Sequence, residues 1–263
     1  MAKQLKFAVF IIAYEAVKTF VSAYERIPNQ IKKEAFDIYV FDDASTDNTY
    51  LAAIGYKYLN KIKKLNIYRN KVNLGYGGNQ KKGYKYAINK GYDVVVMLHA
   101  DAQYAPEKLP EIIKPFKRNP EIAMVFGSRM LGNPLEGGMP IYKFLGNKIL
   151  TFLENLILRT NFSEFHSGYR AYNCNVLKKI PFEKLSNDFH FDTEIIIQLV
   201  SKNYKIVEVP IPTHYGDEKS HVNVIKYGIN CLFAVINYRL LQIPLIKRKF
   251  LNGHEIYRKA RQI

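Results

Sequence analysis

The sequence has 263 residues, of which 48% are hydrophobic, and its 39 Lys and Arg against 23 Asp and Glu give a formal net charge of +16. This length and apolar content fit one large α/β domain with a real core, or two small domains, and exclude disorder for most of the chain. The positive charge attracts polyanions, so nucleic acid, anionic lipid headgroups and phosphorylated small molecules are all candidate partners.

The two cysteines, Cys174 and Cys231, are too few for a disulfide framework. Neither lies near a plausible metal cluster in the sequence, so we interpret both as small buried residues in a reducing interior. The N-terminus lacks the pattern of a signal peptide, and no stretch reaches about 18 uninterrupted apolar residues. The sequence therefore predicts neither a signal peptide nor a membrane-spanning helix.

Apolar segments alternate with helical patterns throughout the first half of the chain. We expect strands at residues 5–13, 36–41, 63–69, 92–98 and 121–127. Helical patterns fill the gaps, near residues 17–27, 48–60, 77–90 and 106–118. Such alternation is typical of an α/β fold in which helices cover both faces of a mainly parallel sheet.

Polar side chains follow three of the expected strands. Asp42 and Asp43 follow the second strand, residues 99–103 follow the fourth, and Ser128 and Arg129 follow the fifth. Ligands of parallel sheets bind at the carboxyl ends of the strands. We therefore expect these three strand ends to converge on one crevice.

The second half of the chain carries two amphipathic helical patterns. Residues 141–159 have an apolar side opposite a polar side, and residues 222–242 have only a narrow polar face, followed by the basic run 247–249. Such helices can lie in a lipid interface, and packing against the sheet is the alternative for each. We divide the chain into a catalytic domain, 1–220, and a C-terminal amphipathic and basic element, 221–263.

The first motif with chemical potential runs from Asp42 to Thr49. Two adjacent carboxylates at a strand end repel each other, so they need hydrogen-bond donors or a cation nearby. The base and ribose of a nucleoside offer such donors, and Thr46 or Asp47 can cap the following helix. A capped turn with solvated acids is the alternative interpretation.

Two further motifs follow the third and fourth strands. The glycine-rich stretch from Asn73 to Asn79 would let the backbone approach an anionic ligand at a helix N-terminus. Asp101 with the amide oxygen of Gln103 suits a hard divalent cation bound to a pyrophosphate. A tight strand-to-helix connection and a helix-capping Asp before Pro106 are the respective alternatives.

Taken in order and spacing, these motifs resemble glycosyltransferase family 2 over roughly residues 5–228. Later blocks are similar to the dolichyl-phosphate mannosyltransferase-like branch of that family. The matching blocks are Ile12–Glu15, Asp42–Thr49, Asn73–Gly77, His99–Gln103 with Pro106, Gly127–Arg129, Ser167–Tyr172, Phe191–Glu194 and Val207–Pro210.

The resemblance implies a glycosyltransferase A-type fold and a nucleotide-sugar donor. Implied donor-binding residues are Ala13, Tyr14, Glu15, Asp42, Asp43, Asn73, Gly75, Tyr76, His99 and Ala100. Asp101 and Gln103 would hold Mg²⁺ or Mn²⁺ on the diphosphate. Implied acceptor-binding residues are Ser128, Arg129, Ser167, Gly168, Tyr169 and Arg170.

The sequence departs from the family pattern at several positions. His99 replaces the first Asp of the family's D-x-D element, and an imidazole cannot supply that carboxylate's charge. Ile12 replaces a proline, Glu15 an asparagine, and Glu164 stands where many relatives have Asp. The chain also shows no C-terminal pair of spanning helices, which many relatives have.

The expected catalytic residues are Asp101, Arg129, Arg170, Asp192 and Glu194. A polyprenyl phosphate acceptor is already ionised near neutral pH, so it needs no strong base, and the two arginines would position it. A saccharide hydroxyl would need a carboxylate base, either Asp192 or Glu194, although both can instead begin a helix. His166 and His214 are weaker candidates.

We therefore expect a metal-assisted, inverting transfer from a GDP- or UDP-sugar to a polyprenyl phosphate. The enzyme would be peripheral at the cytoplasmic face of a membrane. Transfer to a saccharide hydroxyl in cell-surface glycan synthesis and a nucleotide-binding scaffold with little catalysis are the alternatives. Nucleic-acid binding is disfavoured, because the basic residues are spread along helices without a recognition motif.

Overall fold

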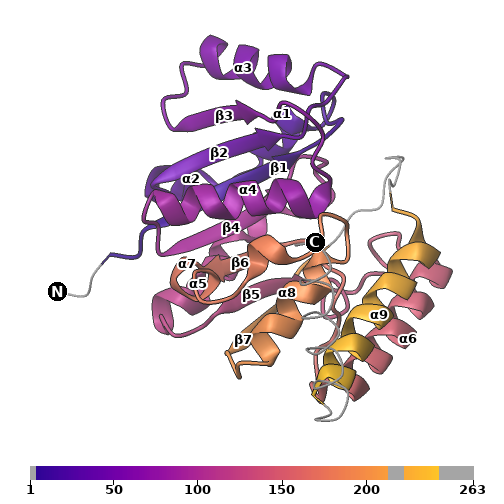
Figure 1. Ribbon diagram of the computed structural model, residues 1–263. Coiled ribbons are helices and arrows are strands. Elements are labelled where there is room, and N and C mark those ends of the chain that lie inside the picture. Colours follow the sequence, from indigo (N-terminus) through magenta and orange to yellow (C-terminus); the bar gives the residue numbers. More distant parts are fainter. Residues whose placement is uncertain (1–3, 213–221, 243–263) are drawn as a thin grey trace, which may run out of the picture.

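The computed structural model describes residues 4–212 and 222–242, and a sheet of seven strands lies at the centre of this part of the chain (Figure 1). The strand order is β3-β2-β1-β4-β6-β5-β7. β6 runs antiparallel to β4 and β5, and the other neighbouring pairs are parallel, which confirms the mainly parallel sheet. The strands are β1 Phe7–Ala13, β2 Asp37–Asp42, β3 Leu65–Arg69, β4 Val94–His99, β5 Met124–Ser128, β6 Arg170–Asn173 and β7 Ile206–Pro210.

Helices connect the strands and cover the sheet. Short 3₁₀ turns, η1 Pro106–Lys108 and η2 Phe182–Lys184, supplement them. The described α-helices are α1 Phe20–Glu25, α2 Asn29–Glu34, α3 Thr49–Leu59, α4 Tyr76–Asn89, α5 Leu109–Arg118, α6 Ile141–Leu158, α7 Cys174–Leu177, α8 Phe191–Val200 and α9 Val224–Leu241.

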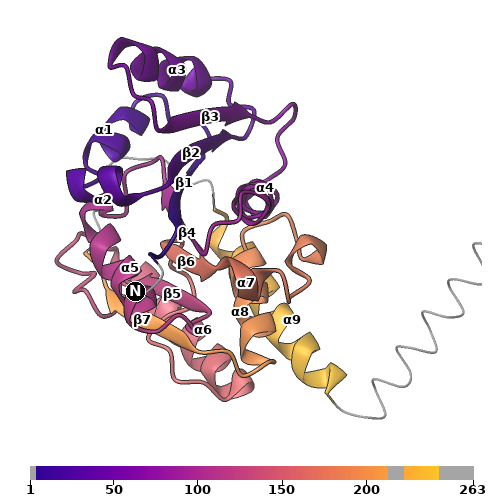
Figure 2. The ribbon, with the colours of Figure 1, turned by 90° about the vertical axis from the view of Figure 1, so that its left-hand side faces the viewer.

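Strand β1 explains why both faces of the sheet are covered. All seven of its residues are buried, and successive side chains point to opposite faces. Val9 and Ile11 pack in a core with residues of α1, α2 and α5, whereas Phe10 packs in a second core with residues of α4, α7 and α8. Figure 2 shows these two sets of helices on opposite sides of the sheet. A near-continuous apolar run is what a strand buried on both faces requires.

Several elements were missing from the sequence-based expectation, which had five strands. β6 has only four residues and begins with a buried arginine, so it lacks an apolar pattern. β7 is a partly exposed edge strand that carries Glu208, and α2 is a single short helix. Short or mixed-polarity segments such as these give little periodic signal.

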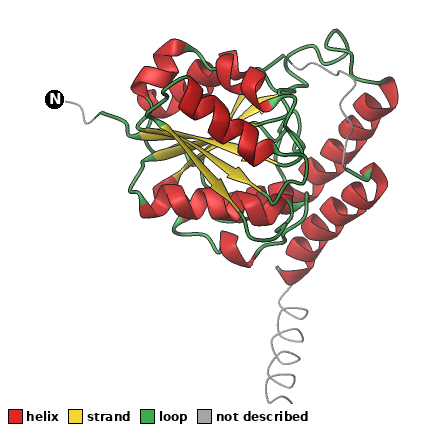
Figure 3. Cartoon of the chain, turned by 90° about the horizontal axis from the view of Figure 1, so that it is seen from above, coloured by secondary structure: helices red, strands yellow, loops and turns green. Residues whose placement is uncertain are grey.

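Helices α6 and α9 pack against each other at one side of the sheet, and α9 also contacts α8 (Figure 3). The two helices are not consecutive in the chain, but we call the pair the α6–α9 hairpin. The polar side of α6, including Thr151 and Glu154, is buried against the protein. Its apolar side faces outward, with Ile149 63% and Phe152 65% exposed. The alternative in which the apolar face of α6 packs on the sheet is therefore wrong.

Helix α9 is, within the described residues, the one helix long and apolar enough to cross a membrane by length and composition alone. A core helix can pass the same test, but only 11% of this helix is buried. The search for uninterrupted apolar runs missed it because Lys226 and Arg239 lie within it. The basic run 247–249 and His214 lie outside the described residues, and the domain boundary at residue 220 stays a prediction.

Candidate active site

A cavity of about 1240 Å³ opens at the carboxyl ends of the parallel strands. Asp43 after β2, Asp101 after β4 and Arg129 after β5 all line it, so the three strand ends do converge. The sequence-derived site residues that line the cavity are Tyr14, Asp43, Asn73, Gly75, Tyr76, His99, Ala100, Asp101, Gln103, Arg129, Gly168 and Asp192.

The two adjacent carboxylates after β2 have different surroundings. Asp43 borders the cavity, and its Oδ1 accepts hydrogen bonds from Asn70 Nδ2 at 2.8 Å and from the Leu74 amide at 2.9 Å. Asp42 is fully buried, bonds to the hydroxyl and amide of Ser45, and lies 3.5 Å from Arg69 Nε. Burial raises the pKa of Asp42, although Ser45 and Arg69 oppose this. Asp42 therefore fixes the turn and does not line the cavity, whereas Asp43 faces it.

The turn after β1 is tied to the turn after β2. Glu15 Oε1 accepts hydrogen bonds from the amide of Thr46 at 2.7 Å and from its hydroxyl at 3.0 Å. Glu15 has a φ of 50°, so these bonds hold it in a left-handed conformation that non-glycine residues rarely adopt. Tyr14, which is 43% exposed, borders the cavity, whereas Ala13 and Glu15 do not. Within this turn, Tyr14 is thus the residue placed to contact a ligand.

The glycines at the start of α4 allow another backbone segment of the protein to pack closely against them. A Cβ on Gly75, whose φ is 78°, would lie 2.6 Å from the carbonyl oxygen of Asn187. A Cβ on Gly77 would lie 2.7 Å from the carbonyl oxygen of Ser186. Residues 186–188 therefore approach these glycines closely, and Asn187 and Asp188 of this segment also line the cavity.

The end of β4 supplies two polar side chains that line the cavity, His99 and Asp101. His99 Nε2 lies 3.0 Å from the hydroxyl of Tyr76, and His99 Nδ1 lies 3.9 Å from Asp101 Oδ2. A Cβ on Gly168 would lie 2.6 Å from His99 Nε2, so only glycine fits there. Burial would raise the pKa of Asp101, but His99 and the Gln103 amide together lower it. Asp101 is thus an ionised carboxylate whose side chain is 40% exposed to the cavity.

Asp192 also borders the cavity, is 4% exposed, and shares the Tyr76 hydroxyl as a partner with His99. Its two oxygens accept hydrogen bonds from Tyr76 at 3.2 Å and from Gln80 at 3.0 Å. Glu194, two residues later on α8, does not line the cavity and instead accepts a hydrogen bond from the Ser186 amide at 2.7 Å. Of the two candidate bases, the geometry brings only Asp192 to the site.

Arg170 does not reach the cavity. It is fully buried and donates hydrogen bonds to the carbonyl oxygens of Ser167 at 2.7 Å, Asp192 at 2.6 Å and Phe165 at 2.5 Å. Its Nε also lies 3.7 Å from Asp192 Oδ2. A guanidinium with these partners holds the wall of the cavity in place.

Arg129 does border the cavity, and it is held by Glu164. Its Nη2 lies 2.7 Å from Glu164 Oε2, and its backbone amide bonds to the same carboxylate. Asn147 on α6 donates to Glu164 Oε2 at 3.2 Å, which links the hairpin to this strand end. Burial would raise the pKa of Glu164, but Arg129 lowers it below its usual value. Three other residues expected at the acceptor are fully buried and do not line the cavity: Ser128, Ser167 and Tyr169.

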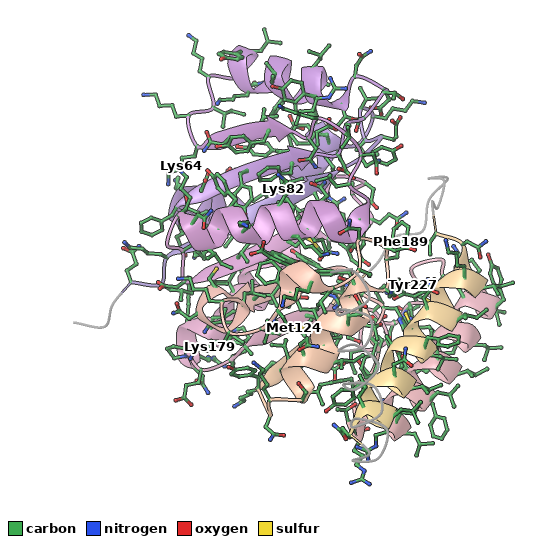
Figure 4. The ribbon with its side chains drawn as sticks, in the orientation of Figure 1. Lys64, Lys82, Met124, Lys179, Phe189 and Tyr227 are labelled. Carbon is green, nitrogen blue, oxygen red and sulfur yellow. The ribbon has the colours of Figure 1, made fainter. Side chains whose placement is uncertain are left out.

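Sequence reasoning missed several residues that shape the cavity. Tyr104 accepts a hydrogen bond from the Gly168 amide at 2.8 Å, and Phe189 stacks on Tyr76 with ring centroids 5.1 Å apart. Figure 4 labels Phe189 near the start of α4 and Tyr227 on α9, and both border the cavity. Tyr104 lies within the matched D-x-D region, so proximity in sequence could have identified it, whereas residue 189 carries no motif.

The same cavity continues between the two helices of the hairpin. Its far walls are apolar and come from both helices, which sequence reasoning did not place near the donor residues. The residues are Tyr142, Ile149, Leu150 and Leu153 of α6 and Val224, Ile225, Ile229 and Leu232 of α9. A polar end and an apolar end therefore share one space.

Comparisons with known proteins identify the family. A family model described as Glycosyl transferase family 2 matches residues 8–181. The chain is 30% identical over 242 residues to UDP-N-acetylglucosamine–dolichyl-phosphate N-acetylglucosaminyltransferase of Methanococcus voltae, covering 85% of this chain and 91% of that protein. It is 24% identical over 257 residues to undecaprenyl-phosphate mannosyltransferase of Micrococcus luteus, covering 90% and 99% respectively.

A solved structure shows a similar fold. Glucosyl-3-phosphoglycerate synthase from Mycobacterium tuberculosis, crystallised with Mn²⁺, uridine diphosphate and phosphoglyceric acid, matches with a TM-score of 0.65 and 14% identity. The match covers 89% of this chain and 78% of that one. It confirms the glycosyltransferase A-type fold expected from the sequence motifs. With the family model spanning the sheet from β1 to β6, this chain belongs to glycosyltransferase family 2 and is a glycosyltransferase.

Proposed function

We propose that this glycosyltransferase moves a sugar from a nucleoside-diphosphate sugar to a polyprenyl phosphate. The observation that carries the proposal is the single cavity, which joins Asp43 and Asp101 at its polar end to the apolar walls of the α6–α9 hairpin. A donor with several charges and an acceptor with a long apolar chain need opposite environments that meet at the reacting atoms. The names of the Methanococcus and Micrococcus relatives, which are lipid-phosphate glycosyltransferases, support the same assignment.

The donor would lie at the strand ends. Asp43 has one oxygen occupied by Asn70 and Leu74, so its other oxygen is the one available to nucleoside N–H or ribose hydroxyl donors. Tyr14 is exposed beside it and can cover a base or ribose. The uridine diphosphate in the Mycobacterium synthase structure supports a nucleotide donor.

The residues that follow β4 fit a divalent cation. Asp101 offers an ionised, partly exposed carboxylate and Gln103 an amide oxygen, which are the hard oxygen ligands of Mg²⁺ and Mn²⁺. Such an ion, when bound, would neutralise charge on the departing diphosphate. His99 adds no negative charge here, and its contacts with Tyr76 and Asp101 orient the carboxylate.

The acceptor phosphate would lie between the polar end and the hairpin. Arg129 and Lys143 border the cavity there and attract an anion. Both oxygens of Asp192 already accept hydrogen bonds, and Arg170 lies beside it, so this carboxylate is held within the wall of the cavity. Asp192 would be the base if a saccharide hydroxyl were the acceptor instead.

The hairpin would place the enzyme at the cytoplasmic face of a membrane. Its outward apolar side chains and the unburied apolar helix α9 expose a surface that water does not favour. The net charge of +16 would add attraction to anionic headgroups.

Transfer into lipid tests the proposal. The full-length chain is incubated with labelled GDP- and UDP-sugars, Mg²⁺ or Mn²⁺, and a polyprenyl phosphate in detergent. The proposal predicts that label enters the organic phase as a phosphate-linked sugar. Label transferred only to saccharide hydroxyls would contradict it, and so would nucleotide binding without any transfer.

A further inference from the structure

A second group of metal-ligating side chains lies away from Asp101 and Gln103. Glu154 of α6, His166 of the segment before Ser167, and Cys231 of α9 bring one ligand atom each within 4.8 Å of one another. The sequence separates these residues widely and gave no hint of a cluster at Cys231. Glu154 and Cys231 are fully buried, and the His166 side chain is 7% exposed.

Two of these ligand atoms lie close together in a buried setting. His166 Nε2 and Glu154 Oε2 are 3.0 Å apart, the distance of an ion pair, although the alignment of the two groups is not that of a regular hydrogen bond. A buried imidazole and carboxylate in this arrangement can share either a proton or a metal ion.

The outer atoms of the cluster are held by a second layer of hydrogen bonds. His166 Nδ1 lies 2.9 Å from the hydroxyl of Tyr227, which leaves Nε2 directed at the cluster. The hydroxyl of Thr193 lies 3.3 Å from both Glu154 Oε1 and Cys231 Sγ. Metal-binding histidines and carboxylates characteristically have their remaining atoms fixed in this way.

We propose that Glu154, His166 and Cys231 bind a zinc ion. Thiolate, imidazole and carboxylate together suit zinc, whereas Mg²⁺ and Ca²⁺ prefer oxygen ligands alone. Three protein ligands leave a fourth position for water, and His166 borders the large cavity, which provides a path of entry. Binding releases the thiol proton of Cys231 and the imidazolium proton of His166, because both must be deprotonated to ligate the ion.

The ion would tie three separate parts of the active-site wall together. Its ligands come from both helices of the hairpin and from the residue that precedes Ser167 and Gly168. Thr193, which supports the cluster, follows Asp192 directly on α8. Zinc would therefore fix the hairpin against the wall of the cavity at a point remote from the donor carboxylates in sequence.

A buried ion pair is the competing state of the same residues. Burial alone would lower the pKa of His166, but Glu154 and Cys231 raise it to about 10, so an imidazolium facing a carboxylate is chemically stable here. That state needs no metal, because Glu154 and Cys231 together stabilise the imidazolium.

Metal analysis and cobalt spectroscopy distinguish the two states. Full-length protein purified without added metal is analysed by elemental mass spectrometry, stripped with a chelator, and titrated with Zn²⁺, Mg²⁺ or Co²⁺. The proposal predicts about one zinc ion per chain and a thiolate-to-cobalt charge-transfer band. It also predicts that Zn²⁺ raises the Tm of the stripped protein by binding at this site, whereas Mg²⁺ does not bind there. Cys231→Ser should abolish the band, and Cys174→Ser, which also removes a buried thiol, should retain it.

Two results would overturn the proposal. One is protein that retains no zinc and whose Tm does not respond to Zn²⁺ after chelation. The other is a cobalt complex of the unmodified chain without the charge-transfer band. The spectrum of the unmodified chain decides the question even if Cys231→Ser does not fold.

Discussion

The two ends of the cavity differ in how their side chains are used. At the strand ends, carboxylates are fixed by several hydrogen bonds each, as for Asp43 and Asp192, and little of their surface is exposed. Along the hairpin, apolar side chains such as Ile225 and Ile229 line the cavity and are exposed. The difference indicates that the strand ends are preorganised for a polar ligand. The hairpin, in contrast, exposes apolar surface that an apolar ligand would cover.

The largest expected effect is at the polar end. Asp101→Asn keeps the size of the side chain but removes the negative charge that would hold the cation and the diphosphate. We expect the transfer rate to fall by about 10³-fold, measured as initial rates at saturating acceptor. Glu183→Gln, an exposed carboxylate bonded to Lys85, is the control and should keep the original rate. Equal transfer rates in the two variants would mean that Asp101 does not hold the cation or the diphosphate.

The next effect concerns the buried support beneath the polar end. Arg170→Met leaves Asp192 without its cation and three carbonyl oxygens without their donor. We expect a loss of about 3–5 kcal/mol in the free energy of unfolding, measured by urea denaturation. A variant of unchanged stability with only a raised KM for acceptor would show that Arg170 contacts the acceptor after all.

A smaller effect is expected from the hairpin surface. Phe152→Glu places a charge on the outward face of α6, and we expect about tenfold weaker sedimentation with anionic liposomes. Leu59→Glu on α3 changes a side chain that is 85% exposed elsewhere, so it should sediment like the original protein. Equal losses in both variants would mean that net charge, rather than the hairpin, governs membrane binding.

The smallest effect is expected at Glu164, whose carboxylate bonds to Arg129 at the strand end and to Asn147 of the hairpin. Arg129 lowers the pKa of Glu164 against the effect of burial, so this carboxylate stabilises the fold above its unfolded-state pKa of about 4.3. That contribution is lost as the pH falls from this value through the lower pKa of the folded state. Glu164→Gln should cost about 1–3 kcal/mol at pH 7 and less at about pH 3, measured by urea unfolding at both values. A cost that does not change with pH would show that the charge of Glu164 contributes nothing.

The polar end was largely predictable from the sequence. Buried parallel strands are long apolar runs, and the polar residues that follow them must lie at one edge of the sheet. The sequence did not reveal which of Asp42 and Asp43 faces the ligand, because neighbouring residues differ in direction and only the tertiary contacts with Ser45 and Asn70 decide it. The sequence also did not reveal that Arg170 is buried. An arginine suggests an anionic partner, whereas here its hydrogen bonds go to backbone carbonyl oxygens.

The hairpin was less predictable. Periodicity identified the apolar side of α6 but did not say whether that side turns inward or outward, because the sequence does not record what covers it. The approach of Glu154, His166 and Cys231 depends on the packing of α6 against α9, which no local pattern encodes.

The dependence of KM on the chain length of the acceptor tests the central claim most directly. Polyprenyl phosphates of increasing isoprenoid number are compared at fixed nucleotide-sugar concentration, with Leu153→Asn as a variant of the apolar wall. We predict that KM for the acceptor falls as the chain lengthens, and that Leu153→Asn weakens this trend while the KM for the donor stays the same. An acceptor KM that is independent of chain length in the unmodified enzyme would contradict the assignment of the hairpin end of the cavity to a lipid.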